Sequence, residues 1–199
     1  FRFRLSTTDG GFDDLLADRA DVALAVREVR PGEREQAMEA GLGDLGAAEQ
    51  ARILALDGLV PIVSAAVERD AIDIADIAAA FAGGIDSWRA MGGADTPIRL
   101  HLQEVDEGHV QGFVDRVLRP AGRALSPEVT HHVDAQAVAA AVSDDPAALG
   151  VVPYRLYGDA RPLALSGGCG RDSMATLETL KTEDYPLTMP LFLYLPVRR

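Results

Sequence analysis

The sequence predicts an α/β fold, because short apolar runs typical of strands alternate with helical patterns along most of its length. The chain has 199 residues, of which 48% are hydrophobic and 25% charged. This composition suits one large domain or two small lobes with a sizeable core. The sequence contains no internal repeat and no low-complexity linker, so we expect a globular protein rather than a fibrous or disordered chain.

The alternation begins at the first residues. Apolar and basic side chains alternate at Phe1–Leu5, which predicts a half-buried strand. The turn residues of Ser6–Gly11 predict the start of a helix, and an apolar run at Val22–Val26 predicts a buried strand. This strand–helix–strand order favours a parallel sheet.

A charged helix and a long apolar segment follow. The helix is expected at Glu33–Leu42. The apolar segment, Ile53–Ser64, holds two runs separated by Asp57 and Gly58, and Pro61 within it indicates an edge or crossing strand.

Strands and helices continue to alternate in the rest of the chain. A helical face at Ile72–Phe81 ends at Gly83 and Gly84. Further helices are expected at 108–118, 135–142 and 174–180, and further strands at 98–102, 129–133, 150–156, 162–165 and 190–195.

The charge balance excludes several kinds of partner. Lys and Arg number 19 against 31 Asp and Glu, a net charge of -12, which argues against binding to nucleic acid or to anionic lipid. No apolar run reaches the roughly 18 residues that a membrane span needs. The single cysteine, Cys169, excludes an internal disulfide framework and a cysteine-based zinc site. It is expected to be a free buried thiol or to have its partner outside these residues.

No catalytic or metal-binding motif is present. The sequence has no G-x-S-x-G elbow for a nucleophilic serine. The histidines and carboxylates between His101 and His109 do not have the spacing of a known metal-ligand set. We therefore predict that the protein is not an enzyme and holds no metal and no cofactor.

Five segments between Ile53 and Pro196 form an ordered set. They are ALDGLVPIV at 55–63, IADIAAAFAGGIDSW at 74–88, MGGADTPI at 91–98, DDPAALGVV at 144–152 and KTEDYPLTMPLFLYLP at 181–196. Together they resemble the motifs of the phosphate-type periplasmic substrate-binding proteins of ABC transporters. The closest resemblance is to the subgroup in which such a domain precedes an OmpA-like peptidoglycan-binding domain.

This resemblance implies a two-lobed type II periplasmic-binding-protein-like fold with a ligand in the cleft between the lobes. Lobe one would comprise residues 1–64 plus 152–199, and lobe two residues 65–151. Strands near Leu59–Ser64 and Gly150–Tyr154 would cross between them. Compared with the family, the chain is expected to lack the first strand, loop and helix, which would leave a gap or a foreign segment beside Phe1–Leu5 or Val22–Val26.

The resemblance also locates a pocket whose chemistry has changed. Relatives place an Arg, a Ser and a Thr at a helix start in lobe two, and the corresponding residues here are Gln103, Glu107 and His109. Gly108 matches the family pattern, and Glu104 keeps the carboxylate in longer form. Glu107 could also act only as a helix-capping acid. A carboxylate at this position would repel an anion, so we expect no tight phosphate binding.

In lobe one, two serines of the family motif are replaced by Ala25 and Val26, while Arg27 remains. The best remaining hydrogen-bond donors belong to the loop before the first helix, although this loop could serve only as a helix cap. The candidate ligand-binding residues are therefore Ser6, Thr7, Thr8, Asp9, Arg27, Gln103, Glu104, Glu107, Gly108 and His109.

The resemblance implies a periplasmic solute-binding-like domain with a degenerate anion pocket. Its expected partners are a small anion or another small solute, and a membrane transporter. The alternative is a cell-envelope interaction module that kept the fold and lost the ligand, with a peptidoglycan-linked partner. The periplasmic location follows from the resemblance only, because these residues contain no signal peptide.

Overall fold

The computed structural model describes residues 4, 6–104, 108–166 and 172–197 of the chain. It divides into two compact units. Unit 1 comprises the described residues of Phe1–Leu56 and Met189–Arg199 together with Gly108, and unit 2 those of Asp57–Val105 and His109–Thr188. The lobe boundaries expected from the sequence differ from these contact-based units and remain a prediction.

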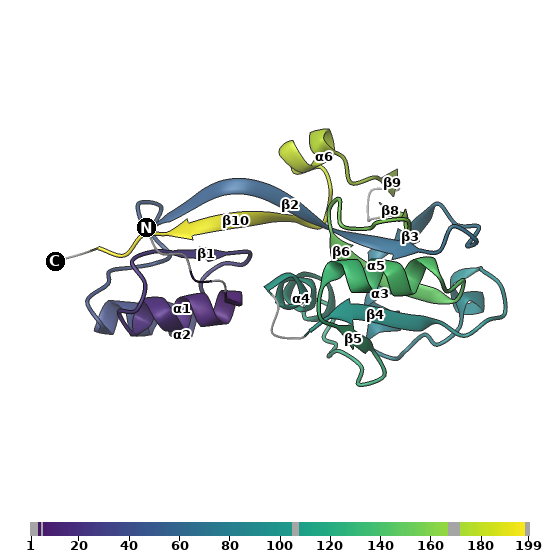
Figure 1. Ribbon diagram of the computed structural model, residues 1–199, viewed down its shortest axis with the longest axis horizontal. Helices are drawn as coiled ribbons and strands as arrows, with labels where there is room; N and C mark the ends of the chain where they lie inside the picture. The colour runs from purple at the N-terminus through teal and green to yellow at the C-terminus, as the bar shows by residue number, and fades with distance from the viewer. Residues whose placement is uncertain (1–3, 5, 105–107, 167–171, 198–199) are drawn as a thin grey trace. The chain divides into compact units, whose positions relative to one another are not determined.

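Unit 1 is a small sheet with helices on one face (Figure 1). Its elements are α1 (Thr8–Leu16), β1 (Ala23–Ala25), α2 (Pro31–Glu39), the first part of β2 (Ala51–Val63) and most of β10 (Thr188–Tyr194). The strand order is β1-β10-β2, and β1 is antiparallel to β10 with Ala23 opposite Tyr194. The parallel partner expected for β1 falls on Phe1–Leu5, of which residues 1–3 and 5 lie outside the described residues.

The core of unit 1 lies between the helices and the sheet. Phe12 and Leu15 of α1 pack with Phe192 and Tyr194 of β10, and the rings of Phe12 and Tyr194 are 4.9 Å apart. Burial of these aromatic rings supplies much of the driving force for folding so small a sheet.

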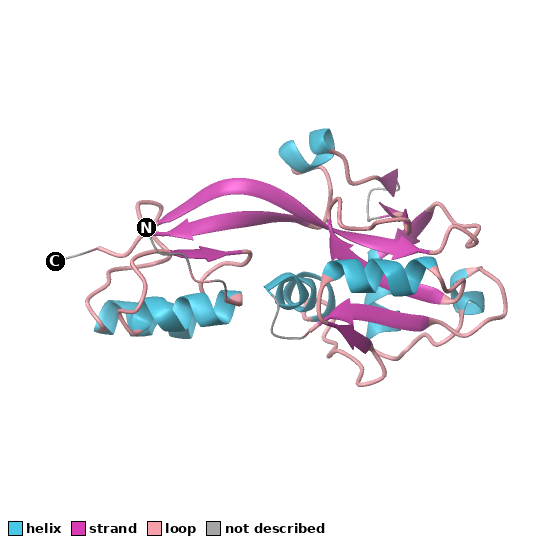
Figure 2. Cartoon of the chain, in the orientation of Figure 1, coloured by secondary structure: helices cyan, strands magenta, loops and turns pink. Residues whose placement is uncertain are grey.

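Unit 2 contains two sheets and most of the helices (Figure 2). In its larger sheet the order is β2-β6-β4-β5 with β7 also paired to β2, and its smaller sheet has the order β3-β8-β9. The elements are β3 (Ala71–Asp73), α3 (Ile74–Phe81), η1 (Trp88–Met91), β4 (Arg99–Gln103), α4 (Gly108–Phe113), η2 (Val114–Leu118), β5 (Thr130–His132), α5 (Ala135–Ser143), β6 (Ala148–Pro153), β7 (Arg161–Pro162), β8 (Ala164–Ser166), β9 (Asp172–Ser173) and α6 (Leu177–Lys181).

Helix α5 covers one face of the larger sheet and contacts β4, β5 and β6. Asp134 caps this helix by accepting a hydrogen bond from Ala137 N at 2.8 Å. Gly150 of β6 allows the close approach, because a Cβ there would lie only 2.8 Å from Val142 and 3.1 Å from Val138. Strand β4 pairs in parallel with both β5 and β6, whereas β6 is antiparallel to β2, so the sheet is mixed rather than parallel.

The structure also locates the segments that were expected to cross between lobes. The two apolar runs on either side of Asp57 and Gly58 belong to one strand, β2, within which Asp57 Oδ1 accepts a hydrogen bond from Gly58 N at 2.7 Å. Strand β10 has residues in both units, and Gly150–Tyr154 lies within unit 2. The expected crossing at Gly150–Tyr154 stays a prediction, together with the lobe boundaries on which it depends. All six residues of β6 are buried, a pattern that a central strand and a crossing strand share.

Candidate functional site

The hydroxyls of the loop before α1 are used within the fold. Thr7 is the N-cap of α1, and its Oγ1 accepts a hydrogen bond from Gly10 N at 3.1 Å. Ser6 is exposed, and its hydroxyl donates to Thr7 O at 3.2 Å. The expected helix start is confirmed, and its capping hydroxyl already has a partner.

Thr8, the first residue of α1, ties the helix to the end of β1. Its side chain is buried, and its Oγ1 accepts a hydrogen bond from Val26 N at 3.4 Å. Gly108 lies against the same two residues, because a Cβ at this position would clash with Thr8 Oγ1 and Val26 Cγ2. The absence of a side chain at Gly108 therefore permits close packing in unit 1.

Arg27, the cation expected to hold an anion, is already paired with two carboxylates. It is only 4% exposed, and its guanidinium contacts Asp9 and lies 2.6 Å from Glu33 Oε1. It also donates to Glu28 O at 2.9 Å and lies over the ring of Phe12, 4.9 Å from its centroid. These contacts occupy one flat face of the guanidinium and donors on both of its terminal nitrogens.

The positive and negative charges of this cluster compensate each other. Burial acts to lower the pKa of Arg27, but the hydrogen bonds that Arg27 donates to Glu33 and Asp9, and the charges of these carboxylates, outweigh it and raise that pKa above its ordinary value. Asp9 is shared with a second arginine, Arg30, at 3.3 Å. Two arginines thus face two carboxylates, and an incoming anion would compete with Asp9 for Arg27.

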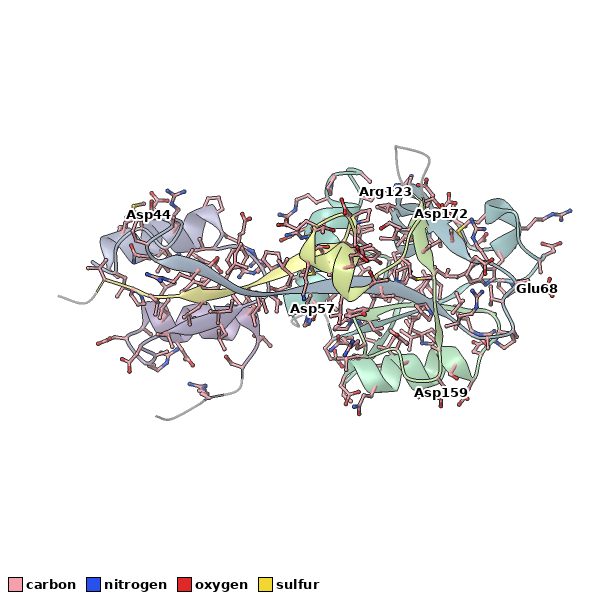
Figure 3. All side chains as sticks on the ribbon, turned by 90° about the horizontal axis from the view of Figure 1, so that it is seen from above. Asp44, Asp57, Glu68, Arg123, Asp159 and Asp172 are labelled. Atoms are coloured by element: carbon pink, nitrogen blue, oxygen red, sulfur yellow. The ribbon has the colours of Figure 1, made fainter. Side chains whose placement is uncertain are left out.

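The candidates of unit 2 lie after β4 and at the start of α4. Gln103 is buried at the end of β4. Its main-chain carbonyl oxygen lies 2.7 Å from His131 Nδ1. Glu104 is exposed. His109 Nε2 lies 3.5 Å from Asp57 Oδ2, so a carboxylate already stands beside this imidazole; Figure 3 labels Asp57. Glu107 lies outside the described residues.

Sequence reasoning placed the candidates but not their partners. Glu33, Arg30 and Asp57 all contact a predicted site residue, and none of them was singled out from the sequence. Arg27 and Asp9 are 18 positions apart, so only the fold reveals their pairing. In the described part of the chain, no cluster of three or more histidine, cysteine or acidic side chains could hold a metal ion.

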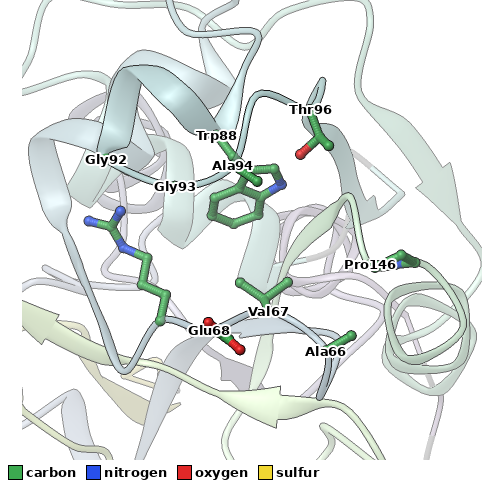
Figure 4. A pocket seen from close by; sticks show the side chains of 10 residues that line it. Ala66, Val67, Glu68, Trp88, Gly92, Gly93, Ala94, Thr96 and Pro146 are labelled. Carbon is green, nitrogen blue, oxygen red and sulfur yellow. The ribbon is translucent and has the colours of Figure 1, made fainter.

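A separate cavity of about 440 Å³ opens in unit 2 beside the turn that contains Trp88 (Figure 4). Val67, Thr96 and Pro146 form part of its walls. The indole is buried, and its Nε1 donates to Ala147 O at 3.1 Å. The indole therefore anchors the turn and leaves little surface for a stacked ligand.

Solved structures with the same fold include a substrate-binding protein and other phosphate-binding proteins. A substrate-binding protein of the phosphate ABC transporter class from Clostridium perfringens, with bound phosphate, gives a TM-score of 0.75 at 19% identity, over 94% of this chain and 71% of that chain. An ABC-type phosphate transport receptor from Vibrio cholerae gives 0.75 at 17% identity, over 94% and 71%. PfluDING, a periplasmic phosphate-binding protein solved with phosphate, gives 0.69 at 10% identity, over 95% and 72%.

At these identities the likeness concerns the fold alone, and it confirms the expected α/β periplasmic-binding-protein fold. No match is found among curated proteins. No helix in the described ranges is long and apolar enough to cross a membrane. The model of the PBP superfamily domain matches residues 1–196. The chain therefore belongs to the PBP superfamily.

Proposed function

We propose that this chain is a periplasmic solute-binding-like domain, related to those of phosphate ABC transporters, whose anion pocket is degenerate. The observation that supports this most is the pairing of Arg27 with Asp9 and Glu33 inside unit 1. An arginine that is buried and shared by two carboxylates offers no uncompensated charge to a ligand.

The residues of unit 2 add to this argument. Gln103, Glu107 and His109 stand where relatives have Arg, Ser and Thr, so a cation is lost and a carboxylate replaces a hydroxyl donor. Two like charges about 4 Å apart repel by about 4 kcal/mol at an effective dielectric constant of about 20. Each hydrogen bond lost to a charged ligand weakens binding by a further ~1.5–3 kcal/mol. Together these changes disfavour phosphate.

Calorimetric titration with phosphate at pH 7.5 tests this function. We expect no binding tighter than millimolar. The double variant Gln103→Arg with Glu107→Ser restores the residue types of relatives and should strengthen any residual binding. A micromolar constant for the unmodified protein would contradict the proposal and would direct attention to Ser6, Thr7 and Thr8 as donors.

A second candidate is an interaction module of the cell envelope that no longer binds a solute. The observation that favours it is the exposed apolar side chains of unit 1, among them Val22, Leu24, Ile53 and Leu54. In this reading the partner is a transporter or a peptidoglycan-linked envelope protein, and an OmpA-like domain adjoins this one in the full-length protein. Neither candidate is an enzyme or a nucleic-acid-binding protein.

Thermal unfolding separates the two candidates. A ligand at a hundred times its dissociation constant adds ~2.7 kcal/mol to the stability of the protein that binds it. A higher midpoint with phosphate, sulfate or a divalent metal supports the solute-binding domain, and an unchanged midpoint with all of them supports the interaction module. The sequence of the full-length gene tests the OmpA-like neighbour and the periplasmic location.

A further inference from the structure

The cavity of about 440 Å³ in unit 2 has a fixed frame. One wall is formed by residues 66–69, between β2 and β3, and the facing wall by residues 92–96, after η1 (Figure 4). Arg69 joins the two walls, because its Nη1 donates to Met91 O, directly before the second wall. Its Nε donates to Ala71 O at 2.6 Å, which fixes the side chain. Such a pre-formed cavity is typical of small-molecule sites.

The second wall is also held by hydrogen bonds of its own. Trp88 N donates to Thr96 O at 2.9 Å, and Ser87 Oγ donates to the same oxygen at 3.1 Å. Gly93 N donates to Trp88 O at 2.8 Å. The shape of the cavity therefore does not depend on a bound molecule.

The apolar part of the lining suits an aliphatic group. It is formed by Val67, Trp88, Ala94 and Pro146. The side chains of Val67 and Trp88 point toward each other from the two walls (Figure 4). Because Trp88 is only 3% exposed, it offers little surface to a stacked ring. A compact branched group can instead fill the space beside Val67 and Pro146.

Two side chains of opposite charge, Glu68 and Arg69, line the same cavity. Glu68 is exposed and has no hydrogen bond or ion pair among the described residues. Nη2 of Arg69 donates no hydrogen bond in this part of the chain, and its ion pair with Asp76 Oδ2 is long, at 4.0 Å. Both charges are therefore available to a ligand.

The charged residues that directly flank the lining residues in the sequence are already paired. The pairs are Arg161 with Asp70 at 3.2 Å, Arg89 with Asp95 at 3.0 Å, and Arg99 with Asp145. Asp86 and Asp144, one position further along the chain, are not among the lining residues. The cavity thus offers one carboxylate and one guanidinium. A simple cation would meet Arg69 and a simple anion would meet Glu68, so a ligand with both charges is favoured.

We propose that this cavity binds a small zwitterion with a branched aliphatic side chain, that is, an aliphatic α-amino acid. Its ammonium group pairs with Glu68, and its carboxylate accepts hydrogen bonds from Arg69. Its side chain packs against Val67 and Pro146. Glu68 and Arg69 are consecutive residues, with Cα atoms about 3.8 Å apart, so together they can contact two groups that are bonded to one carbon atom. This site lies within unit 2 and does not depend on the candidate anion pocket.

Calorimetric titration with L-leucine at pH 7.5 tests the proposal, together with two analogues that each lack one charged group. The amine 3-methylbutylamine keeps the aliphatic group and the ammonium, and 4-methylpentanoate keeps the aliphatic group and the carboxylate. We expect leucine to bind with a dissociation constant below about 1 mM. Each analogue should bind at least about tenfold more weakly, because it leaves one charged side chain of the cavity without its partner.

Two variants and a matched control locate the site. Glu68→Gln should weaken leucine binding at least about tenfold and should not weaken binding of 4-methylpentanoate, which has no ammonium group. Ala94→Trp, at an exposed position of the second wall, should fill the cavity and abolish leucine binding. The control is Glu128→Gln, which removes the same charge at an exposed side chain of unit 2 outside the cavity. It should leave binding unchanged.

Circular dichroism confirms that each variant is folded. The proposal is overturned if leucine does not bind at concentrations up to about 10 mM, or if either analogue binds as tightly as leucine. It is also overturned by equal effects of Glu68→Gln and Glu128→Gln, or by unchanged binding in Ala94→Trp. The phosphate titration above can fail without affecting any of these results.

Discussion

His101 Nδ1 lies 2.9 Å from His132 Nε2, so the two imidazoles share a hydrogen bond between β4 and β5. His101 is 9% exposed, and its Nε2 has no partner among the described residues. Burial, with a smaller contribution from the neighbouring His132, lowers the pKa of His101 below its usual 6.5. The neutral form of His101 is therefore favoured inside unit 2.

The lowered pKa of His101 predicts that the protein loses stability in mild acid. Because the pKa of His101 is lower in the folded state, the unfolded chain binds more protons as the pH falls below about 6.5. The free energy of unfolding should be highest above that pH and should decrease as the pH falls toward the folded pKa. Urea unfolding at pH 7.5 and 5.5 measures the difference, and His101→Gln should reduce it. An equal decrease in the variant would show that another group is responsible.

Because Arg27 is buried between two carboxylates, we expect its removal to cause a large loss of stability. Arg27→Met leaves Asp9 and Glu33 close together without their shared cation, so the free energy of unfolding should fall by about 3–5 kcal/mol. The control is Arg89→Met, because Arg89 forms an ion pair with Asp95 in which both side chains are exposed. That variant should change stability by less than about 0.5 kcal/mol. Comparable losses in the two variants would contradict the structural role of Arg27.

The packing around Gly108 predicts that even a methyl group is not tolerated. Gly108→Ala should lower the free energy of unfolding by about 1–3 kcal/mol, because the new Cβ meets Thr8 and Val26. Gly32 in α2 has no heavy atom within 4 Å of the corresponding position. Gly32→Ala should therefore be neutral or slightly stabilising. Denaturant unfolding of both variants checks the contrast, which would be absent if this part of unit 1 were loosely packed.

The buried phenol of Tyr194 leads us to expect a loss of stability at alkaline pH. Its Oη accepts a hydrogen bond from Val29 N at 2.9 Å, and burial raises the pKa of Tyr194 to about 12. Because the unfolded phenol ionises near pH 10, the contribution of Tyr194 to stability is complete below pH 10 and is lost as the pH rises toward 12. Tyr194→Phe should remove this part of the alkaline loss in unfolding experiments from pH 9 to 11.5. A variant with an unchanged alkaline profile would refute the assignment.

Much of the fold follows from periodicity, and the errors have identifiable causes. The helix start at Thr7 and the Ala-rich helix α5 were predicted because a cap and an apolar face are local features. The continuity of β2 was not, because Asp57 and Gly58 have the composition of a turn, and only the strand at Ala51–Val63 shows that they remain extended.

The candidate site was harder to predict for a different reason. The sequence identifies Arg27 as a cation but not its burial or its two carboxylate partners, which come from α1 and α2. Likewise, strand alternation separates His131 from His132, but it does not reveal that His132 meets His101 on the neighbouring strand. Contacts between elements depend on the register of β4 and β5, which a single sequence does not encode locally.

Trp88 is the only tryptophan of the chain, and its indole is buried in unit 2. Its fluorescence emission therefore reports on unit 2 alone, whereas far-ultraviolet circular dichroism detects the helices of both units. Substitutions in unit 1, such as Arg27→Met, and in unit 2, such as His101→Gln, can thus be followed with two signals in one sample. Coincidence of the two transitions would mean that the units unfold as one cooperative system, and separation would give the stability of each.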